Sequence, residues 1–543
     1  MVLSRVGALV SEAAGAALAT GRVAVRVGIG QPLVRPDRLL GMAGALRHWG
    51  MSPGAVCAVN AARDPGRVAV IDDRERVTWA DLDRRSTAVA TALADRGVVA
   101  GDAVALLARN SAAFVVAQAA ISKLGADILY ANTGFAAPQL GEVLQREGTV
   151  AVVADDEFDP LLDEAVPDLP RLTAWVEDGS APDLSFAAVD ATTDPPALPS
   201  PGRDSRHVIL TSGTTGAPRG AARSVPAPLA AVAAAVSLLD AIPYRPRRTT
   251  LLAAPAFHAW GLGNLVVASL LSSTIVMSRR FDPAHTLDLV AEHGVDTLVG
   301  VPVMCERLLD VDPAPATPSL RVAAVSGSAL APTLPARFMD RFGDVLYNLY
   351  GSTEVAFVSV AGPHDLRVAP TSAGRVLRGV RVALVDDDEQ PVAPGEVGRI
   401  FAGSGLSFEG YTSGEDKVRI GSLASIGDLG HFGSDGRLYV EGRDDDMVIS
   451  GGENVYPAEV EELLHHHPAV ADVAVVGVTD ERFGQALVAH VVRRRDADVR
   501  AEELRRYVRT HLANYKVPRE VVFHDRLPRN ETGKVIKREL ARG

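Results

Sequence analysis

Short apolar segments that alternate with helical patterns are the feature that most constrains how this chain can fold. The strand-like segments are residues 68–71, 103–107, 151–154, 297–301 and 322–326. A helical pattern follows Thr78, a candidate N-cap, and another covers residues 114–124 and ends at Gly125. Because strand–helix–strand units place helices on the faces of a sheet, the alternation predicts an α/β fold with largely parallel sheets.

A change of pattern near Gly442 divides the chain. Its 543 residues exceed the size of one hydrophobic core, so we expect at least two domains. A turn at residues 434–436 before an apolar segment predicts a hairpin, and the acidic run 444–446 follows it. The residues beyond have an α+β pattern of their own. We therefore expect a large N-terminal domain, residues 1–442, and a small mobile C-terminal domain, residues 443–543.

Composition argues against several classes of protein. The formal net charge of −12 argues against general binding to nucleic acid, because a polyanion would be repelled. Cys57 and Cys305 are the only cysteines and stand far apart, which argues against a disulfide framework or a zinc cluster and fits a reducing cytosol. We therefore expect a cytoplasmic protein.

Two apolar stretches could pass for membrane segments. Residues 249–278 contain no Asp, Glu, Lys or Arg and are long enough to span a bilayer. Proline, histidine, glycine and asparagine interrupt them, so we interpret them as a buried strand, a site loop and a helix from residue 265. Charged residues interrupt 1–30, which argues against a signal peptide. Two alternatives stay open for that segment: packing against the main body, or peripheral contact with a membrane as an amphipathic helix.

Residues 211–220, with the sequence TSGTTGAPRG, are expected to form a phosphate-binding loop. An apolar run at 207–210 predicts a strand that leads into it. Glycines at 213, 216 and 220 let the backbone turn sharply and approach a ligand. The candidate ligand-binding positions in the loop are Gly213, Gly216, Thr211, Ser212, Thr214, Thr215 and Arg219. Hydroxyl, amide and guanidinium donors in one loop suit a polyphosphate, although no Gly-Lys-Ser/Thr closes it as in the common P-loop.

Six further motifs follow in an order that is typical of one superfamily. They are residues 253–261, 326–330, 350–354, 427–430, 450–457 and 530–537. With the loop they cover roughly residues 55–540 and resemble the AMP-forming adenylating enzymes, which comprise acyl-CoA synthetases, beetle luciferases and nonribosomal-peptide adenylation domains. The family loop usually carries lysine where this chain has Arg219. Only 5 of the 55 basic residues are lysine, so arginine there follows the composition of the chain.

The residues around 350–354 predict a nucleotide site. Tyr350 is suited to stack on a base, Thr353 to donate to a phosphate oxygen and Glu354 to hold Mg²⁺, and the family assigns the same roles. The resemblance implies that Asp428 accepts both ribose hydroxyls. It further implies nucleotide or acyl contacts for Gly327, Ser328, Ala329, Gly351 and Arg443.

The resemblance also implies residues that act in the chemistry. Lys534 would offset the repulsion between the carboxylate and the phosphate as they react. His258 would lie beside the carboxylate and the entry channel of the thiol, although a buried core histidine is the alternative from the residues alone. Gly452 would allow close approach to the pantetheine arm of CoA. Asp445 is the expected hinge between the domains.

The implied function is that of an ATP-dependent carboxylate–CoA ligase. ATP with Mg²⁺ and a carboxylic acid would give acyl-AMP and pyrophosphate, and CoA would then displace AMP. A fatty acid is the expected substrate, because residues 132–136 and 281–287 resemble high-GC bacterial fatty-acyl-CoA synthetases and no acidic or basic residue lies at 253–263 beyond His258. Two alternatives stay open: an enzyme that loads a carrier protein, and a nucleotide-binding homologue without catalysis.

Overall fold

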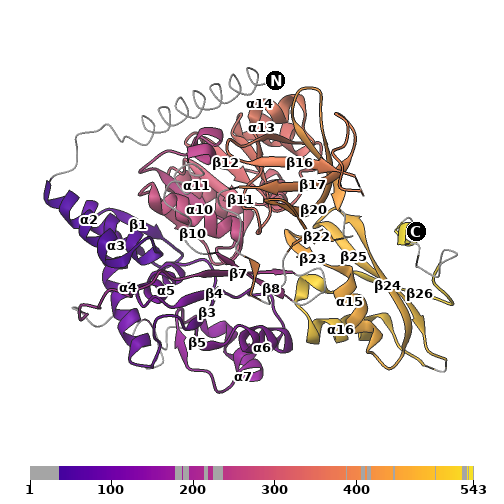
Figure 1. Cartoon of the computed structure of the whole chain (residues 1–543), viewed down its shortest axis with the longest axis horizontal. Helices are drawn as coiled ribbons and strands as arrows, with labels where there is room; N and C mark the ends of the chain where they lie inside the picture. Colours follow the sequence, from indigo (N-terminus) through magenta and orange to yellow (C-terminus); the bar gives the residue numbers. More distant parts are fainter. Residues whose placement is uncertain are drawn as a thin grey trace.

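The computed structural model describes residues 36–177, 186, 195–212, 218–223, 236–386, 388–404, 410–412, 417–443, 447–495, 497–528, 535 and 537–541. Figure 1 shows layers of sheet and helix in the N-terminal part and a smaller group of strands and helices at the C-terminal side. This confirms the α/β fold with a large N-terminal and a small α+β C-terminal unit. Residues 1–30 lie outside the described residues, so both alternatives for that segment stay predictions.

The first sheet forms a mainly parallel layer. Its order is β18-β8-β7-β4-β3-β5-β6, in which β3 to β7 run parallel and β8 and β18 antiparallel. Every residue of β4 is buried, as expected for a parallel strand that is covered on both faces. The strands are β3 (Ala103–Leu107), β4 (Asp127–Tyr130), β5 (Thr149–Ala154), β6 (Arg171–Thr173), β7 (His207–Ser212), β8 (Pro218–Arg223) and β18 (Gly410–Tyr411).

The second sheet is parallel in only one half, which corrects the expectation of largely parallel sheets. Among the described residues it has 14 strands in the order β16-β17-β20-β21-β15-β14-β13-β12-β11-β9-β10-β1-β2, with β19 beside β20. The parallel half contains β1 (Val68–Ile71), β9 (Thr249–Leu252), β10 (Thr274–Met277), β11 (Thr297–Gly300), β12 (Val322–Val325) and β13 (Leu346–Tyr350), with β2 (Arg76–Thr78) antiparallel at its edge.

The other half of this sheet is antiparallel, because most of its strands follow one another without a crossover helix. It contains β14 (Ser359–Ala361), β15 (Ser372–Val376), β16 (Arg381–Val385), β17 (Gly398–Gly403), β19 (Arg419–Ile420), β20 (Leu423–Phe432) and β21 (Leu438–Arg443). The hairpin expected at 434–436 is confirmed as the connection between β20 and β21.

Helices cover the sheets, and one hydrophobic core joins the two. That core contains Phe114 and Tyr130 from the first sheet and its helix, and Leu265 and Ile275 from the second. The helices of the N-terminal part are α2 (Pro36–Trp49), α3 (Pro53–Arg63), α4 (Trp79–Ala94), α5 (Ala112–Lys123), α6 (Ala137–Arg146), α7 (Asp159–Ala165), α10 (Ala259–Leu270), α11 (Pro283–Glu292), α12 (Pro302–Leu309), α13 (Leu334–Phe342) and α14 (Pro363–Val368), with the 3₁₀ turn η1 (Asp156–Phe158).

Local sequence explains two helix starts. Thr78 caps α4 as expected: its hydroxyl accepts from the amide of Asp81, whose side chain accepts in turn from the amide of Thr78. The helix expected from residue 265 instead begins at Ala259, with His258 as its N-cap residue. Gly261 allows this earlier start, because a Cβ there would lie 2.0 Å from the carbonyl oxygen of Pro255.

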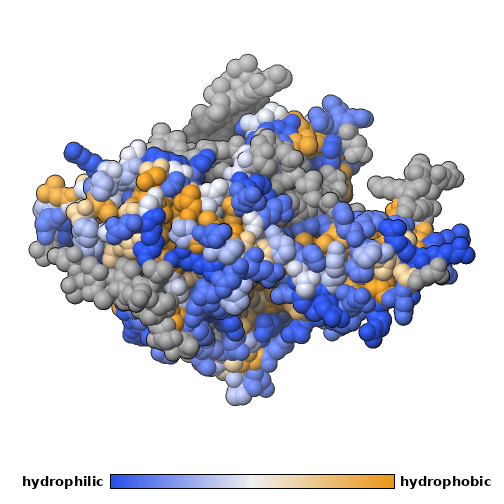
Figure 2. Space-filling model, turned by 90° about the horizontal axis from the view of Figure 1, so that it is seen from below, coloured by the Kyte–Doolittle hydropathy of each residue, from blue (hydrophilic) through white to orange (hydrophobic). Residues whose placement is uncertain are grey.

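The stretch 249–278 is therefore a strand, a loop, a helix and a second strand. Among the described helices, none combines the length and the apolar character that crossing a bilayer requires. Figure 2 shows apolar residues at the end of the molecule where α2 lies, and the exposed leucines of that helix are Leu39, Leu40 and Leu46.

The C-terminal part has its own sheet and core. Its strands are β22 (Val448–Ser450), β23 (Glu453–Val455), β24 (Val470–Asp480), β25 (Gly484–Arg493) and β26 (Glu520–His524), of which β24 and β25 form a long antiparallel pair. The helices α15 (Pro457–His465) and α16 (Ala501–His511) contribute Val460, Leu464, Leu504 and Val508 to a separate core. The turn η2 (Asn514–Lys516) and the short α17 (Lys537–Leu540) complete it.

Candidate active site

The parallel strands of the second sheet gather most of the predicted site at one edge. Because β9, β11, β12 and β13 run parallel, the segments that follow them all lie at their carboxyl ends, where α/β sheets bind ligands. His258 follows β9, Gly327 to Ala329 follow β12, and Tyr350 ends β13. A Cβ on Gly327 would lie 3.7 Å from the side chain of Val301, which follows β11.

Tyr350 and Asp428 are joined directly. The Tyr350 hydroxyl donates to Oδ2 of Asp428 at 2.6 Å, and Asp428 is 6% exposed. Asp428 lies on β20 opposite Arg443 of β21, so the register brings these two predicted positions together; only the backbone of Arg443 is described. The candidate base-stacking ring and the candidate ribose acceptor therefore share one corner of the site.

The turn after Tyr350 is tight. A Cβ on Gly351 would lie 2.1 Å from the carbonyl oxygen of Ala356, a contact that no real side chain could make. Ala356 itself has φ of 72°, a conformation that costs a non-glycine residue about 1 kcal/mol or more. This compact turn carries Thr353 and Glu354 back toward the edge of the sheet.

Glu354 is buried and held by a residue that sequence analysis missed. Its Oε1 accepts from the Tyr411 hydroxyl at 2.6 Å, and Lys417 Nζ lies 3.9 Å from the same oxygen. Tyr411 lies on β18, which pairs with β8 at Ala221. Glu354 is thereby tied to the strand that follows the predicted phosphate loop.

The predicted phosphate loop connects two antiparallel strands. The end of β7 pairs with the start of β8, with Thr211 opposite Arg219. The backbones of Thr211, Ser212 and Arg219 are described, but their side chains are not, and Gly213, Thr214, Thr215 and Gly216 lie outside the described residues. Tyr411, opposite Ala221, thus lies beside the strand that follows the loop.

The donor set fits a magnesium ion that is shared with phosphates. Mg²⁺ is bound in proteins through one or two carboxylates together with substrate phosphates and water, and Glu354 supplies one such carboxylate. Within the described part of the chain, no group of three or more His, Cys, Asp or Glu residues could hold a metal by itself. A metal at this place would therefore depend on the nucleotide for its other ligands.

His258 meets the C-terminal part. Its Nε2 lies 2.8 Å from Oε1 of Glu453 on β23, and the His258 side chain is 29% exposed. Burial alone would lower the pKa of His258, but the Glu453 carboxylate outweighs it and holds that pKa above its ordinary value. Gly452 lies against Val301, with 3.7 Å between its built Cβ and the valine side chain.

Two further predicted residues are not placed. Lys534 and Asp445 lie outside the described residues, so their roles stay predictions. Tyr411, Lys417 and Glu453 were missed as side chains of the site. Glu453 had one local signal, since it directly follows Gly452, whereas nothing near Tyr411 or Lys417 in the sequence pointed to Glu354.

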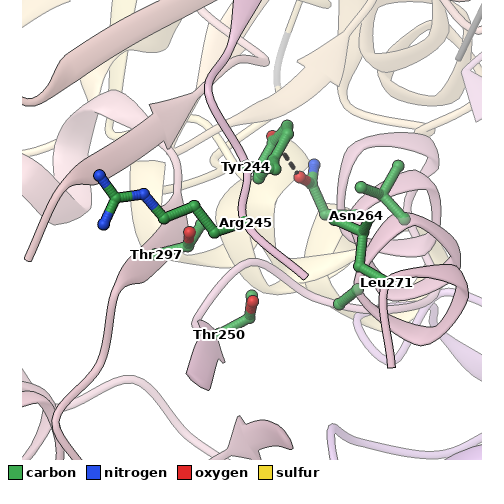
Figure 3. A pocket seen from close by; sticks show the side chains of 8 residues that line it. Tyr244, Arg245, Thr250, Asn264, Leu271 and Thr297 are labelled. Atoms are coloured by element: carbon green, nitrogen blue, oxygen red, sulfur yellow. Dashed lines mark hydrogen bonds between the residues drawn. The ribbon is translucent and has the colours of Figure 1, made fainter. Parts of the chain in front are cut away.

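A small pocket elsewhere does not belong to this site. It lies between α10 and the amino ends of β9 and β11, where Thr250 and Thr297 face Asn264 (Figure 3). The Tyr244 hydroxyl donates to Oδ1 of Asn264 at 2.7 Å across it. The amino ends of parallel strands are at the opposite edge of the sheet from His258, so this pocket is remote from the gathered residues.

The fold and the site define a class of two-part α/β enzymes that bind a nucleotide at the carboxyl edge of a sheet. The family model of the AMP-binding enzyme matches residues 57–412, and that of the AMP-binding enzyme C-terminal domain matches residues 459–534. The chain therefore belongs to the family of AMP-binding, adenylate-forming ligases.

Curated relatives act on different acids. A fatty acid–[acyl-carrier-protein] ligase of Streptomyces coeruleorubidus is 31% identical over 89% of this chain and 94% of that protein. A feruloyl-CoA synthase of an Amycolatopsis species is 32% identical over 89% of this chain and 97% of that protein. The family is thus shared by relatives whose acids and acceptors differ.

Solved structures of one relative differ in their likeness to this chain. The o-succinylbenzoate CoA synthetase of Bacillus subtilis, as a double mutant with a product analogue, gives a TM-score of 0.79 at 27% identity over 90% of this chain and 98% of that one. The same enzyme with its acyl-adenylate intermediate gives 0.64 at 28% identity over 89% and 97%. Sequence identity and coverage are nearly equal in the two comparisons, so the difference in TM-score is a difference in three-dimensional likeness to this chain.

Proposed function

We propose that this chain is an AMP-forming carboxylate–CoA ligase whose acid is a fatty acid. The observation that carries the proposal is the meeting of the two parts at the sheet edge: Gly452 and Glu453 of the C-terminal part lie against Val301 and His258. A ligase that transfers an acyl group to a thiol needs a second surface that closes over the adenylate, and this loop supplies one. The greater likeness to the product-analogue complex supports the same reading.

The residues at the edge divide the first half-reaction among them. Tyr350 stacks on adenine and Asp428 accepts from the ribose, while Thr353 and the 211–220 loop bind phosphate oxygens. Glu354 would hold Mg²⁺ together with the phosphates, and the bound ion would supply positive charge to stabilise the leaving pyrophosphate. The acid is held beside His258, and Lys534 lies between the two anions as they join.

Support for a fatty acid comes from two sides. Relatives of this chain include ligases of fatty acids, one at 31% identity and another, from Mycobacterium tuberculosis, at 30% over 86% of this chain and 92% of that protein. In addition, His258 is the only titratable side chain in 253–263, so no fixed charge is present there to pair with a charged substrate. An apolar acyl chain is the substrate class that such a segment accommodates best.

The second candidate is an enzyme that transfers the acyl group to a carrier protein. The relative from Streptomyces coeruleorubidus, whose acceptor is an acyl-carrier protein, favours it. Both candidates form the same adenylate, and they differ only in the thiol that consumes it.

One assay tests both candidates. Purified protein with ATP, Mg²⁺ and a panel of saturated, branched and aromatic acids should release pyrophosphate with fatty acids above all. Adding CoA should then release AMP and give the acyl-CoA thioester, detected by mass. Pyrophosphate release without a CoA-dependent thioester would favour the carrier protein, and no pyrophosphate with any acid would refute the proposed function.

A further inference from the structure

We propose that His258 and Glu453 form a proton-accepting pair for the incoming thiol, completed only when the C-terminal part docks. The two residues are 195 positions apart and come from different parts of the chain, yet Nε2 of His258 lies 2.8 Å from Oε1 of Glu453. The inference rests on the proposed function, because it concerns the second half-reaction of that ligase.

The Glu453 carboxylate is oriented from both sides. Its Oε2 accepts from Nδ2 of Asn132 at 3.3 Å, while Oε1 faces the imidazole. The Asn132 amide is itself fixed, because its Oδ1 accepts from the amide of Gly134 at 2.8 Å. The carboxylate therefore meets the imidazole from a defined direction rather than as a loose surface charge.

The chemistry of the partners assigns the tautomer of His258. An ionised carboxylate can only accept a hydrogen bond, so Nε2 must carry the proton that faces Glu453. In the neutral imidazole Nδ1 then holds the free lone pair, and among the described residues no hydrogen bond engages it. In this arrangement the carboxylate, by accepting from Nε2–H, raises the basicity of Nδ1, and Nδ1 is the nitrogen that accepts a proton.

The pair lies where a thiol would have to approach. His258 begins α10 directly after the loop from β9, at the carboxyl edge of the sheet. Gly452, the residue before Glu453, lies against Val301, and Gly327 lies against the side chain of the same valine. The imidazole is thus at the junction between the adenylate edge and the docked loop.

The proposed step is balanced without a further reactant. The thiol sulfur bonds to the carbonyl carbon of acyl-AMP, and the bond from that carbon to the phosphate oxygen breaks. AMP leaves with the electron pair, and the thiol proton moves to Nδ1 of His258. Glu453 stabilises the imidazolium that results, and the proton passes to water when the C-terminal part undocks.

The charged and titratable groups near the pair set the direction of the pH dependence. Besides Glu453 itself, Glu459 belongs to this group of charges, because Tyr515 and Lys516 of the docked part lie within electrostatic reach of both carboxylates. Only neutral His258 accepts a proton, and Glu453 holds its pKa above the ordinary value. The rate of thioester formation should therefore rise with pH and level off above the pKa of His258.

The test starts from a supplied adenylate, so that adenylation does not enter the measurement. Full-length enzyme is mixed with dodecanoyl-AMP and CoA in single turnovers from pH 5.5 to pH 9. E453Q should lower the plateau rate by about a hundredfold and move the midpoint of the profile to lower pH, because the imidazole loses its anionic partner. E441Q is the matched control, because it removes the carboxylate charge from another His–Glu pair, that of His431 and Glu441 at 2.9 Å.

The outcomes of this experiment support or overturn the proposed role of Glu453 and His258 as follows. A lowered plateau with an unchanged midpoint in E453Q would overturn it, because a merely structural Glu453 would leave the imidazole pKa where it was. If E453Q does not fold, His258→Asn serves instead and should remove the imidazole step from the profile. Wild-type enzyme that releases pyrophosphate but forms no thioester with CoA refutes this inference and the CoA acceptor, whereas absence of pyrophosphate refutes the proposed function as a whole.

Discussion

At the scale of single residues, the site is built from short polar contacts between side chains that lie far apart in sequence. The Tyr350 hydroxyl reaches Asp428 and the Tyr411 hydroxyl reaches Glu354, both at 2.6 Å. In each pair a neutral hydroxyl donates to a carboxylate, which orients the acid without adding a competing charge. Lys417 is the exception, because it brings a positive charge to within 3.9 Å of Glu354.

Lys417 should make magnesium binding weaker than Glu354 alone would allow. A cation near the carboxylate repels an incoming dication, and at this separation the interaction is worth about 1 kcal/mol in a water-like surrounding. In Lys417→Met, the Mg²⁺ concentration for half-maximal ATP binding should fall several-fold, as measured by calorimetric titration. Lys537→Met removes the same charge from a pair with Glu461 and is the control. A higher Mg²⁺ requirement in Lys417→Met would contradict the prediction.

Lys534 should act in one half-reaction only. Its predicted role is to stabilise charge as the carboxylate attacks the phosphate, so Lys534→Ala should slow adenylation by orders of magnitude, a loss of about 3–4 kcal/mol. Thioester formation from supplied acyl-AMP should survive. The measurement is pyrophosphate release beside single-turnover thioester formation, and an equal loss in both would assign the lysine another role.

At the scale of elements, the two parts of the chain meet through polar contacts. Nε2 of Gln139 on α6 donates to Glu459 on α15 at 3.1 Å, and the other oxygen of Glu459 pairs with Lys516. Burial lowers the pKa of Lys516, against the opposing effect of Glu459. A contact that is polar on both sides leaves each partner soluble when the parts separate, which suits a reversible docking surface.

Gln139 should therefore stabilise the arrangement in which the C-terminal part is docked. Gln139→Leu removes the donor and leaves a buried carboxylate oxygen of Glu459 unpaired on docking, at a cost of about 1–3 kcal/mol. Thioester formation should slow by about tenfold or more, while pyrophosphate release stays near its original rate. Gln145→Leu makes the same change at an exposed position of α6 and should alter neither step. Equal loss of both steps in Gln139→Leu would indicate damage to the fold instead.

At the scale of the whole molecule, separate cores carry the two cysteines. Cys57 lies on α3 in the core that joins the two sheets, and Cys305 lies on α12 in a second core around β11 and β12. Both thiols are buried, and burial raises the pKa of each to about 12. Because the thiolate is the reactive form, neither should react with a disulfide reagent in the folded protein at pH 8.

The two thiols should report unfolding of two different cores. With an aromatic disulfide reagent at pH 8, the native protein should show no fast thiol, and two should appear in concentrated guanidinium chloride. At intermediate denaturant concentrations, the thiol reaction that is lost in Cys57→Ala reports the first core, and the reaction that is lost in Cys305→Ala reports the second. Immediate reaction of the native protein would contradict the burial of both side chains.

Much of the framework of the candidate nucleotide site was predictable because it depends on local order. Apolar runs predicted β9, β11 and β12, and parallel pairing places the segments that follow these strands at one edge of the sheet. His258 and Gly327 lie at the same edge for that reason. The antiparallel half of the second sheet was not predicted, because short strands such as β14 carry no periodicity that distinguishes their direction. Nor did the sequence indicate that α10 begins at Ala259, which depends on the close approach of Gly261 to Pro255.

The sequence by itself determined the family, the strand–helix order and the residue types at the sheet edge, since these depend on neighbours along the chain. Only the tertiary structure decided which side chains meet. Glu354 contacts Tyr411, which is 57 positions away along the chain. His258 contacts Glu453, which is 195 positions away and lies in the C-terminal part. No local pattern encodes either pair. The first depends on the pairing of β18 with β8 within the N-terminal part, and the second on the meeting of the two parts, which depends on the shape and charge of both surfaces at once.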